Sequence, residues 1–451
     1  MPDTLSAIVS KPRAPRARAT LFVGLCADAP HRGPARFGLE DVDTITLGRG
    51  GARAAERRAS TLAIALDDAR LSTQHARMTR LGARWVLEDL GSKNGTWIGG
   101  DAVQQHTLDD GDVIEVGHTM LVFRDHGGEA GDLDGAPDAD APGLATLSPA
   151  LAQQFASVAR GARSSVPVMI GGETGTGKEL IARAVHALSG RTGPFVAVNC
   201  GAVPATLVEA ELFGHRKGAF TGAGDERTGL IRSAHGGTLF LDEIGELPGQ
   251  AQAALLRVLQ EGEVTPVGAD RAISVDVRLV TATLRDLDEE VAHGRFRGDL
   301  LGRLLGLAVR LPPLRERRED LGMLVAQLLD RASPSARIRM TPDVVRTLYA
   351  HAWPRNIREL ERTLAAACAL ARDVIDLEHL PESVRASIPS PRVLTSPGAL
   401  TDDERRLRDQ LAAALAEHAG NVAAVARALG KDRTQIRRWM RRFHLLRPDD
   451  S

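Results

Sequence analysis

The spacing of hydrophobic and polar positions changes several times along the chain. From Thr20 to Arg124, short β-favouring runs alternate with turns rich in Gly and Asp, as at 44–47, 84–87 and 113–116, and this predicts a small β-sandwich. From Leu144 to about Ile388, apolar runs alternate with longer segments of helical periodicity, which predicts a parallel α/β sheet. The strand-like runs of this second region are 166–170, 195–198, 238–241 and 275–280.

The remaining patterns are wholly helical. After Pro312-Pro313 the periodicity predicts a helical subdomain that caps the sheet, with Thr341 as an N-cap and Pro342 in the first helical position. Near the C-terminus, the apolar helix 421–429 ends at Gly430 and a second helical pattern follows at 432–443. One face of that second pattern carries Ile436, Met440 and Phe443. Two helices around a turn glycine predict a helix-turn-helix.

These patterns predict three domains. A chain of 451 residues is too long for one core, since domains average about 150 residues. Between Asp125 and Gly143 there are six acidic residues, no Lys or Arg, and no apolar face, so we expect a linker. The predicted intervals are a flexible tail 1–19, a sandwich 20–124, an acidic linker 125–143, an α/β domain with lid 144–388, a linker 389–400 and a helix-turn-helix domain 401–451, opened by a capping box at 401–404.

Composition narrows the classes of function. Lys and Arg number 57 against 58 Asp and Glu, so nucleic-acid affinity must come from a local basic segment. Aromatic residues are 3% of the chain, which argues against a stacking platform for single strands. The three cysteines are widely separated and form no disulfide framework or metal motif. With no signal peptide or transmembrane run, we expect a cytoplasmic protein.

A glycine-rich loop follows the first strand-like run of the α/β region and precedes a helical pattern. Glycines let backbone N–H groups converge on phosphate oxygens, the helix N-terminus adds partial positive charge, and a lysine supplies a full one. This predicts a site for a polyphosphate. A Glu follows the lysine where Ser or Thr usually binds Mg²⁺. The predicted nucleotide-binding residues of the loop are Gly172, Glu173, Thr174, Gly175, Thr176, Gly177, Lys178 and Glu179.

Two adjacent carboxylates end the apolar run 238–241. Asp242 is predicted to orient hydrated Mg²⁺, and Glu243 to polarise the attacking water. An acidic pair after a strand is usually a solvated strand end, but this one follows Lys178 within the same α/β unit. We therefore predict that this pair is catalytic.

The region from about Leu147 to Ile388 resembles the AAA+ domain of bacterial enhancer-binding proteins, ATPases that activate transcription by RNA polymerase carrying sigma-54. The most specific element is the sequence GAFTGA at 218–223, preceded by ELFGH at 211–215. The resemblance implies that this loop contacts sigma-54, and its glycines allow a mobile tip. The implied contact residues are Gly218, Ala219, Phe220, Thr221, Gly222 and Ala223.

The same resemblance implies further roles. Asn199 is similar to the family's switch asparagine, which restrains the catalytic glutamate, here Glu243. Arg297 and Arg303 resemble paired arginine fingers that reach a neighbouring subunit's γ-phosphate, which implies a homo-oligomeric ring. Arg358 resembles the sensor II arginine, carried by the lid.

Three positions depart from the family pattern. Leu284 stands where the family commonly has the asparagine of sensor I, and its side chain lacks the amide that could place water. Gly298 separates the predicted fingers, and Arg355 replaces a glycine. These departures bear on the rate and regulation of hydrolysis more than on nucleotide binding.

The N-terminal region resembles a forkhead-associated domain, through LGR at 47–49, STQH at 72–75 and LGSKNGT at 90–96. Such domains bind phosphothreonine, which implies a partner phosphorylated by a serine/threonine kinase. Arg49 and Ser72 can contact phosphate oxygens, and Lys93 and Asn94 can hold phosphate and peptide backbone. Thr73 belongs to the same predicted site, whereas His75 is expected to be structural. The alternative is a sandwich that keeps these turns without phosphopeptide affinity.

The C-terminal region resembles the Fis-type DNA-binding domain of the same family. From Arg427 to Arg447 there are eight Lys or Arg and one Asp, which is the local segregation of charge that duplex binding needs. The alternative is a solvated basic helix. The residues predicted to meet major-groove edges and phosphates are Arg433, Thr434, Gln435, Arg437, Arg438, Arg441 and Arg442.

Together these features predict a sigma-54-dependent transcriptional activator. It would bind DNA upstream of promoters, form a ring, and hydrolyse ATP to convert sigma-54 polymerase to the open complex, under control of phosphothreonine recognition. The alternative, motivated by Leu284, is a phosphopeptide-binding DNA adaptor or repressor with weak or absent ATP turnover. An AAA+ remodeller unrelated to transcription is remote, because GAFTGA and the helix-turn-helix occur together.

Overall fold

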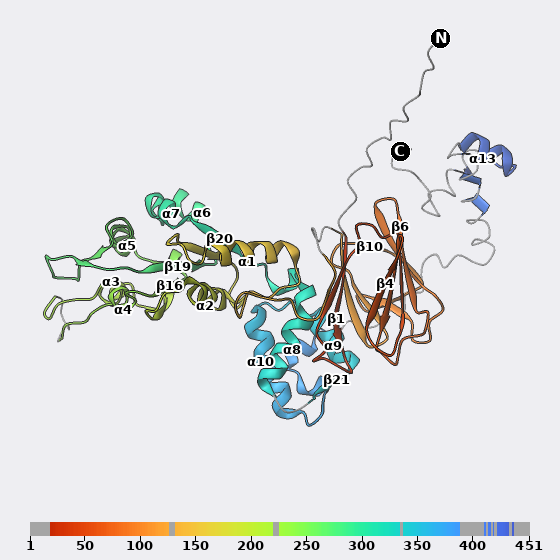
Figure 1. Ribbon diagram of the computed structural model, residues 1–451, viewed down its shortest axis with the longest axis horizontal. Coiled ribbons are helices and arrows are strands. Elements are labelled where there is room, and N and C mark those ends of the chain that lie inside the picture. Colours follow the sequence, from red (N-terminus) through yellow and green to blue (C-terminus); the bar gives the residue numbers. More distant parts are fainter. Residues whose placement is uncertain are drawn as a thin grey trace, which may run out of the picture. The chain divides into compact units, whose positions relative to one another are not determined.

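The computed structural model describes residues 19–125, 131–219, 225–333 and 337–387, together with parts of 410–436. The chain divides into two compact units, Met1–Arg392 and Val393–Ser451. The first contains a β-sandwich, a parallel α/β sheet and a helical lid (Figure 1). The predicted fold classes of these three parts are confirmed.

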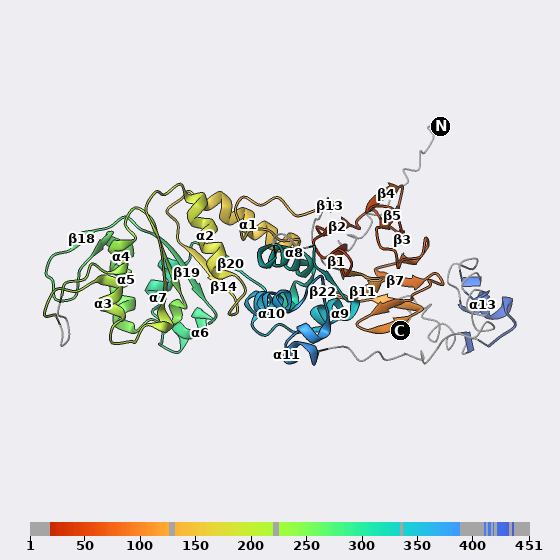
Figure 2. The ribbon, with the colours of Figure 1, turned by 90° about the horizontal axis from the view of Figure 1, so that it is seen from below.

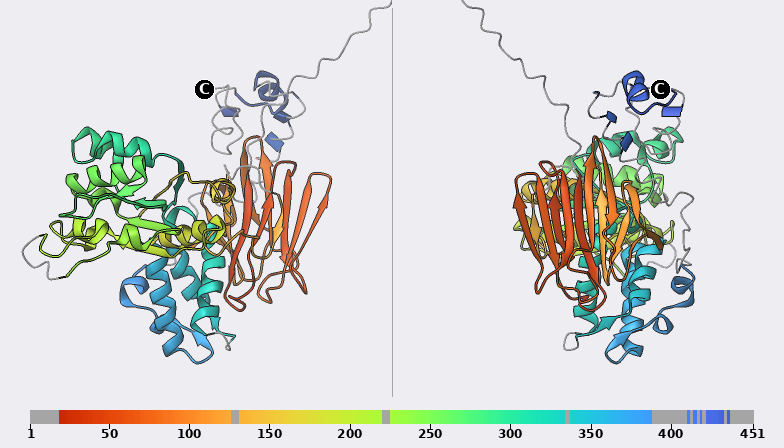
Figure 3. Two further views of the ribbon diagram at one scale, coloured as in Figure 1. Left: turned by 60° about the vertical axis from the view of Figure 1, so that its left-hand side comes forward. Right: turned by 90° about the vertical axis from the view of Figure 1, so that its right-hand side faces the viewer.

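The sandwich has one seven-stranded and one six-stranded sheet, packed face to face (Figure 3). Alternating side chains of both sheets fill its core, among them Leu21, Leu47, Trp85 and Phe123. The strands are β1 Thr20–Cys26, β2 Ala35–Gly38, β3 Thr44–Arg49, β4 Ala54–Arg58, β5 Thr61–Leu66, β6 Ala76–Leu81, β7 Arg84–Asp89, β8 Thr96–Ile98, β9 Asp101–Val103, β10 Gln105–Leu108, β11 Val113–Val116, β12 Thr119–Arg124 and β13 Leu133–Asp134.

The acidic segment after the sandwich is held to it. Strand β13 pairs with β2, and Asp132 accepts a hydrogen bond from the backbone N–H of Gly38. The guanidinium of Arg57 donates to the same carboxylate, with 2.9 Å between Nε and Oδ2. Paired charges and two strand residues therefore fix a stretch whose composition, taken alone, predicts a free linker.

The α/β sheet has five parallel strands in the order β15-β16-β19-β14-β20. Separate apolar clusters cover its two faces, which is the arrangement of a sheet buried between helices (Figure 2). Its elements are α1 Pro149–Gly161, β14 Val168–Gly171, α2 Lys178–Ser189, β15 Phe195–Asn199, α3 Val208–Phe213, α4 Leu230–Ser233, β16 Thr238–Asp242, α5 Gly249–Glu261, the hairpin pair β17 Glu263–Val264 and β18 Ile273–Ser274, β19 Arg278–Thr283, α6 Leu287–Ala292, α7 Gly298–Leu304 and β20 Leu307–Arg310.

The lid is formed by α8 Leu321–Ala332, α9 Pro342–Ala350, α10 Asn356–Leu370 and α11 Glu382–Arg385. Thr341 is the N-cap of α9 with Pro342 behind it, as predicted, although the Thr341 hydroxyl bonds to Asp376 rather than to the helix. The prediction of a wholly helical lid is wrong in one detail. Two short parallel strands, β21 Arg339–Met340 and β22 Val374–Ile375, tie the segments before α9 and after α10 together.

The second unit is described in part. Helix α13 Val422–Ala428 is followed by Gly430 with φ of 61°, as expected for a turn glycine. Ile436 is fully buried against Leu411, Ala414, Val425 and Ala426. The predicted face of Ile436 is thereby confirmed, whereas Met440, Phe443 and the capping box at 401–404 lie outside the described residues.

Asp89, at the end of β7, organises the loop that carries LGSKNGT. Its Oδ1 accepts hydrogen bonds from the backbone N–H groups of Gly91 and Ser92, both at 2.9 Å. Its Oδ2 accepts from the hydroxyls of Ser92 and Thr96, at 2.6 and 2.7 Å. Burial raises the pKa of Asp89, but these hydrogen bonds outweigh burial and leave the pKa below its ordinary value.

We predict that Asp89→Ala lowers the free energy of unfolding of the sandwich by about 2 kcal/mol, because four donors lose their acceptor. Hydrogen exchange of the β6 and β7 amides in urea measures this. Because the folded pKa is depressed, the contribution is complete above about pH 4 and is lost as the pH falls through the folded value. Glu88→Ala, at an exposed position of the same strand, is the control; equal effects of both variants would contradict the assignment.

Candidate functional site

The glycine-rich loop joins β14 to α2 at the carboxyl end of the parallel sheet. Gly172, Gly175 and Gly177 have φ of 152°, 81° and 105°, a region that side-chain-bearing residues rarely adopt. A Cβ on Gly175 would lie 2.2 Å from the carbonyl oxygen of Arg355, so the loop is also sterically closed to larger residues. The loop is therefore shaped by its glycines to expose backbone N–H groups at a helix N-terminus, where anions bind.

Lys178 lies in the first turn of α2 with 6% of its surface exposed. Its ammonium donates to the carbonyl of Gly172 at 2.9 Å and lies 3.2 Å from Oε1 of Glu243. The predicted pair of loop lysine and catalytic glutamate thus meets in the structure. Glu179, by contrast, points along the helix surface and accepts hydrogen bonds from Arg183, at 2.6 and 3.0 Å.

The acidic pair ends β16. Burial raises the pKa of Asp242, against the opposing attraction of Lys178. Glu243 has φ of 55°, a strained conformation for a non-glycine residue, of the kind that concentrates at functional sites. Its Oε2 accepts a hydrogen bond from the backbone N–H of Leu284 at 3.2 Å. The predicted sensor I position thus reaches the carboxylate through a backbone N–H, which every residue except proline supplies.

Asn199 ends β15 in register with Asp242. Its side-chain oxygen accepts hydrogen bonds from the backbone N–H groups of Gly201 and Ala202, at 3.0 and 3.1 Å. The structure therefore places the predicted switch residue beside the acidic pair, with its amide oxygen turned toward the turn that follows β15.

The lid contacts the glycine-rich loop directly. The carbonyl of Gly175 accepts hydrogen bonds from the backbone N–H groups of Ile357, at 2.9 Å, and Arg358, at 3.4 Å. Arg358 is exposed at the start of α10, and its Cβ lies 3.1 Å from the position of a Cβ on Gly175. The predicted sensor II residue therefore sits at the edge of the loop.

Sequence reasoning missed a second set of lid contacts. Arg315 binds the carboxylate of Glu173, with nitrogen–oxygen distances of 2.6 and 3.0 Å, and this pairing lowers the pKa of Glu173. The buried amide of Asn356 donates to Glu173 and to the carbonyl of Thr174, at 3.1 and 3.0 Å. Both residues lie in motifs that the sequence shows, Arg315 in LPPLRER and Asn356 in WPRN, but neither motif indicates that its residue contacts Glu173.

Arg297 and Arg303 lie at the two ends of α7. Arg297 is the N-cap residue and pairs with Asp299, with 2.7 Å between Nη2 and Oδ2. Both side chains are exposed. They are therefore accessible to a second protein molecule, as the finger interpretation requires.

The GAFTGA loop has a fixed base. His215 and Arg227 form a two-way backbone bridge, with both N···O distances 3.0 Å. A Cβ on Gly229 would lie 2.3 Å from the nitrogen of Gly214, so the two arms touch. Gly218 and Ala219 are described, and Gly218 has φ of 80°. Phe220, Thr221, Gly222 and Ala223 lie outside the described residues.

The predicted phosphothreonine residues gather at one end of the sandwich. The backbone N–H of Arg49 donates to the carbonyl of Ser72 at 3.0 Å, and the Ser72 hydroxyl accepts from the backbone N–H of Lys93 at 3.1 Å. Asn94 donates from its side chain to the carbonyl of Arg70 at 2.6 Å. The side chains of Arg49, Thr73, Lys93 and Asn94 are exposed, so they can meet a ligand.

His75 is a structural residue, as expected. It is fully buried, its Nδ1 accepts from the backbone N–H of Ser72 at 3.2 Å, and its Nε2 lies 3.1 Å from the carbonyl oxygen of Gly95. Gly48 is equally constrained, because a Cβ there would lie 2.0 Å from the carbonyl oxygen of Thr73. Both residues position the loops without facing a ligand.

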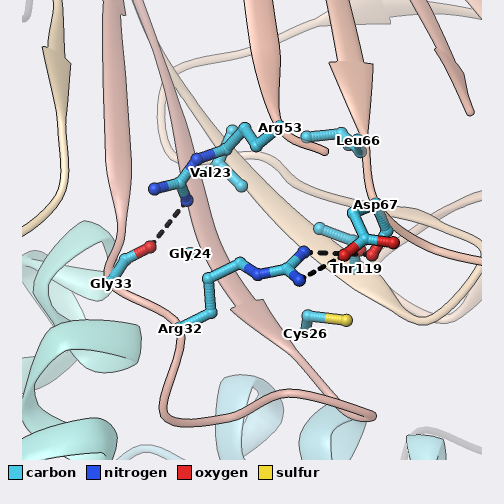
Figure 4. A pocket seen from close by; sticks show the side chains of 9 residues that line it. All are labelled: Val23, Gly24, Cys26, Arg32, Gly33, Arg53, Leu66, Asp67 and Thr119. Carbon is cyan, nitrogen blue, oxygen red and sulfur yellow. Dashed lines mark hydrogen bonds and ion pairs between the residues drawn. The ribbon is translucent and has the colours of Figure 1, made fainter. Parts of the chain in front are cut away.

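A small cavity elsewhere in the sandwich does not serve as a ligand site. Its volume is about 20 Å³, close to that of a single water molecule (Figure 4). Its two cationic side chains are already paired, Arg32 with Asp67 and Arg53 with Asp134. The cavity shares no residue with the predicted phosphothreonine set.

Of the predicted DNA-contacting residues, Gln435 is described and is exposed. Arg433, Thr434, Arg437, Arg438, Arg441 and Arg442 lie outside the described residues. In the part of the chain that the structure describes, no helix combines the length and apolar character needed to cross a bilayer.

Comparison with protein families divides the chain in the same way. Residues 45–117 match the FHA domain model, and residues 144–310 match the sigma-54 interaction domain model. Residues 315–396 match the AAA+ ATPase lid domain, and residues 408–443 match the bacterial regulatory protein model of the Fis family. Each match falls on the part of the chain from which the corresponding resemblance was inferred.

Several curated proteins are similar to this chain. The acetoin catabolism regulatory protein of Cupriavidus necator is 45% identical over 312 residues, 66% of this chain and 47% of that protein. The anaerobic nitric oxide reductase transcription regulator NorR of Salmonella dublin is 44% identical over 315 residues, 66% of this chain and 62% of that protein. The chain therefore spans roughly half to three-fifths of the length of these relatives.

Among solved structures, NtrX from Brucella abortus in complex with ADP is similar to this chain. The two are 31% identical, with a TM-score of 0.50, over 65% of this chain and 68% of that one.

Proposed function

Because the chain belongs to the family of sigma-54-dependent transcriptional activators, we propose that it hydrolyses ATP at the site between β14, α2 and β16 to remodel promoter-bound polymerase carrying sigma-54. The observation that carries this proposal is the meeting of Lys178 and Glu243, 3.2 Å apart, under a lid bonded to the loop. We propose that DNA upstream of the promoter is held by the C-terminal unit, which matches the Fis family model.

The residues present fit a nucleoside triphosphate. The glycines give the loop a backbone conformation that side chains would disfavour, and Lys178 is a desolvated cation at a helix N-terminus. Phosphate oxygens that bind Lys178 would replace the carboxylate of Glu243 as its partner. The released Glu243 carboxylate could then accept a proton from water. Mg²⁺, when bound, would neutralise charge on the phosphates, and we propose that Asp242 would hold it through water.

The finger residues support assembly. Arg297 and Arg303 are exposed on α7, so a neighbouring subunit's phosphate could replace Asp299 as the partner of Arg297. We propose that hydrolysis therefore depends on formation of a homo-oligomeric ring.

We propose that the input is a phosphothreonine-containing protein. The exposed side chains of Arg49, Lys93 and Asn94 lie around the half-buried Ser72, within a loop set that His75 and Asp89 hold in place. Two cations and several neutral donors suit a phosphate dianion.

The roles assigned to Lys178 and Glu243 predict that one variant loses ATP binding and the other loses hydrolysis. Lys178→Ala is expected to lose ATP binding, because the buried cation that balances phosphate charge is gone. Glu243→Gln is expected to bind ATP but to release phosphate about 100-fold more slowly, because an amide cannot accept the proton. Glu246→Gln, a nearby carboxylate paired with Arg285, is the control.

Binding of labelled ATP and release of phosphate, measured over a range of protein concentrations, check these expectations. A wild-type chain that binds ATP but releases no phosphate at any concentration would favour the adaptor or repressor hypothesis. Equal loss of hydrolysis in Glu246→Gln would contradict the role assigned to Glu243.

The GAFTGA loop is predicted to act on polymerase rather than on ATP. Thr221→Ala is expected to retain ATP hydrolysis and lose open-complex formation, because Thr221 belongs to none of the motifs assigned to nucleotide binding or hydrolysis. Promoter opening by sigma-54 holoenzyme measures this. Thr228→Ala, at the base of the same loop, should open the promoter normally. Normal opening by Thr221→Ala would overturn the assignment.

Arg49→Ala is predicted to weaken binding of a phosphothreonine peptide pool at least about tenfold, because a charge-assisted hydrogen bond is lost. Fluorescence anisotropy with phosphorylated and unphosphorylated pools measures the affinity. Arg77→Ala, an exposed arginine on β6, should bind as the wild type does. Unchanged affinity in Arg49→Ala would remove the proposed input.

A further inference from the structure

The sandwich is packed against the lid along a surface that we call the seam. It is formed by β1, β11 and β12 on one side, and by α8, α9 and the segment 314–320 on the other (Figure 2). Strand β1 is buried on both faces: Leu21 and Val23 lie in the sandwich core, whereas Phe22 and Leu25 belong to the lid cluster. A free sensory domain would leave that second face to water.

The seam includes a close approach of two backbones. A Cβ on Gly322, in α8, would lie 2.4 Å from the carbonyl oxygen of Gly24 in β1. A Cβ on Gly24 would lie 2.1 Å from the hydroxyl of Tyr349, in α9. Neither position has room for a side chain without displacement of the lid. The seam is therefore packed as tightly as a domain interior.

Among the described residues, two arginine–carboxylate pairs cross the seam, in addition to the contact of His31 with Asp330 on α8. Arg346 on α9 binds Glu115 on β11, with 2.6 Å between Nη2 and Oε1. Arg124 at the end of β12 binds Glu319, with 2.7 Å between Nη2 and Oε2, and also donates to the carbonyl of Glu316. In each pair the carboxylate is 6% exposed. Without its arginine, each carboxylate would stay buried and lose the cation that is hydrogen-bonded to it.

The pairs differ in what lies behind them. Glu316 and Glu319 flank Arg317, a buried residue whose Nη2 donates to the carbonyl of Thr176 in the glycine-rich loop, at 2.9 Å. Asp320, which follows Glu319, is also buried, and its carboxylate accepts a hydrogen bond from the backbone N–H of Leu147 at 2.6 Å. Arg124 therefore binds the same segment, 314–320, that donates a hydrogen bond to the glycine-rich loop through Arg317. Arg346 joins β11 to α9, and among the described residues no hydrogen bond of α9 to the glycine-rich loop is seen.

We propose that Arg124 is a positioning residue for the nucleotide site, supplied by a different domain. By holding Glu316 and Glu319, it fixes the segment 314–320 and, through Arg317, the shape of the loop that receives phosphate. The sandwich thereby sets the affinity for nucleotide. This inference rests on the proposed ATP site and adds the means of its regulation.

The other end of β12 is tied to the phosphothreonine loops. Asp68 accepts hydrogen bonds from the hydroxyl of Thr119, at 2.8 Å, and from the backbone N–H of Arg70, also at 2.8 Å. Arg70 in turn accepts through its carbonyl from Asn94. One short strand therefore runs from the loops that would bind phosphate to the residue that holds the nucleotide site.

The test compares the two seam ion pairs in the full chain. Arg124→Ala is expected to weaken binding of fluorescent ADP about fivefold or more, a usual size for coupling between sites. In steady-state hydrolysis KM should rise with less change in kcat. Arg346→Ala removes a pair from the same seam whose carboxylate is as buried as Glu319, so it is the matched control and should bind ADP as the wild type does. Thermal unfolding verifies that both variants fold.

Arg124→Lys provides a second variant. It keeps a positive charge beside Glu319, which protects folding, but it lacks the planar fork that reaches Glu319 and the carbonyl of Glu316 together. Its affinity for ADP is expected to fall between those of the wild type and Arg124→Ala.

The outcomes separate the two proposals. Wild-type chain that fails to bind ADP would overturn the proposed ATP site. Wild-type binding with no loss in either Arg124 variant would overturn the positioning role alone. Equal losses in Arg124→Ala and Arg346→Ala would also overturn it, because a general loosening of the seam would then explain the effect.

Discussion

A buried arginine and the backbone carbonyl that it contacts form the constraint on which the other parts of the first unit depend. Arg317 is 5% exposed, and burial lowers its pKa; Asp320, Glu319 and the carbonyl of Thr176 stabilise its buried charge. The glycine-rich loop supplies one of the groups that stabilise that charge. Loop, lid and sandwich are therefore linked through one desolvated cation.

The local parts of the site could be predicted from sequence because each lies in a short motif. Lys178 and Glu243 are 65 residues apart, yet the order strand, loop, helix, strand brings them to one edge of the sheet. His75 was also assigned correctly from its place in a loop motif. The roles proposed for Arg297 and Thr221 rest on resemblance, and their proposed partners are other molecules.

Contacts between distant segments could not be predicted. Glu173 with Arg315 and Arg124 with Glu319 are separated by 142 and 195 residues, and nothing in either sequence neighbourhood specifies its partner. The acidic segment illustrates the same limit: its composition suggests a free linker, whereas Asp132 is held by Arg57 from another strand. Composition indicates whether a segment can bury enough apolar surface to fold alone. Here the neighbouring sheet supplies strand pairing and ion pairs that the segment cannot form by itself.

The contact between Gly24 and Gly322 bears on how such a protein could evolve. Signalling proteins often gain new inputs by exchange of whole sensory modules, which is easiest when a module hangs from a tether. Here an incoming module would need a bare backbone opposite Gly322 and an arginine within reach of Glu319. Recombination at this boundary would therefore give working hybrids only between parents that already share both residues.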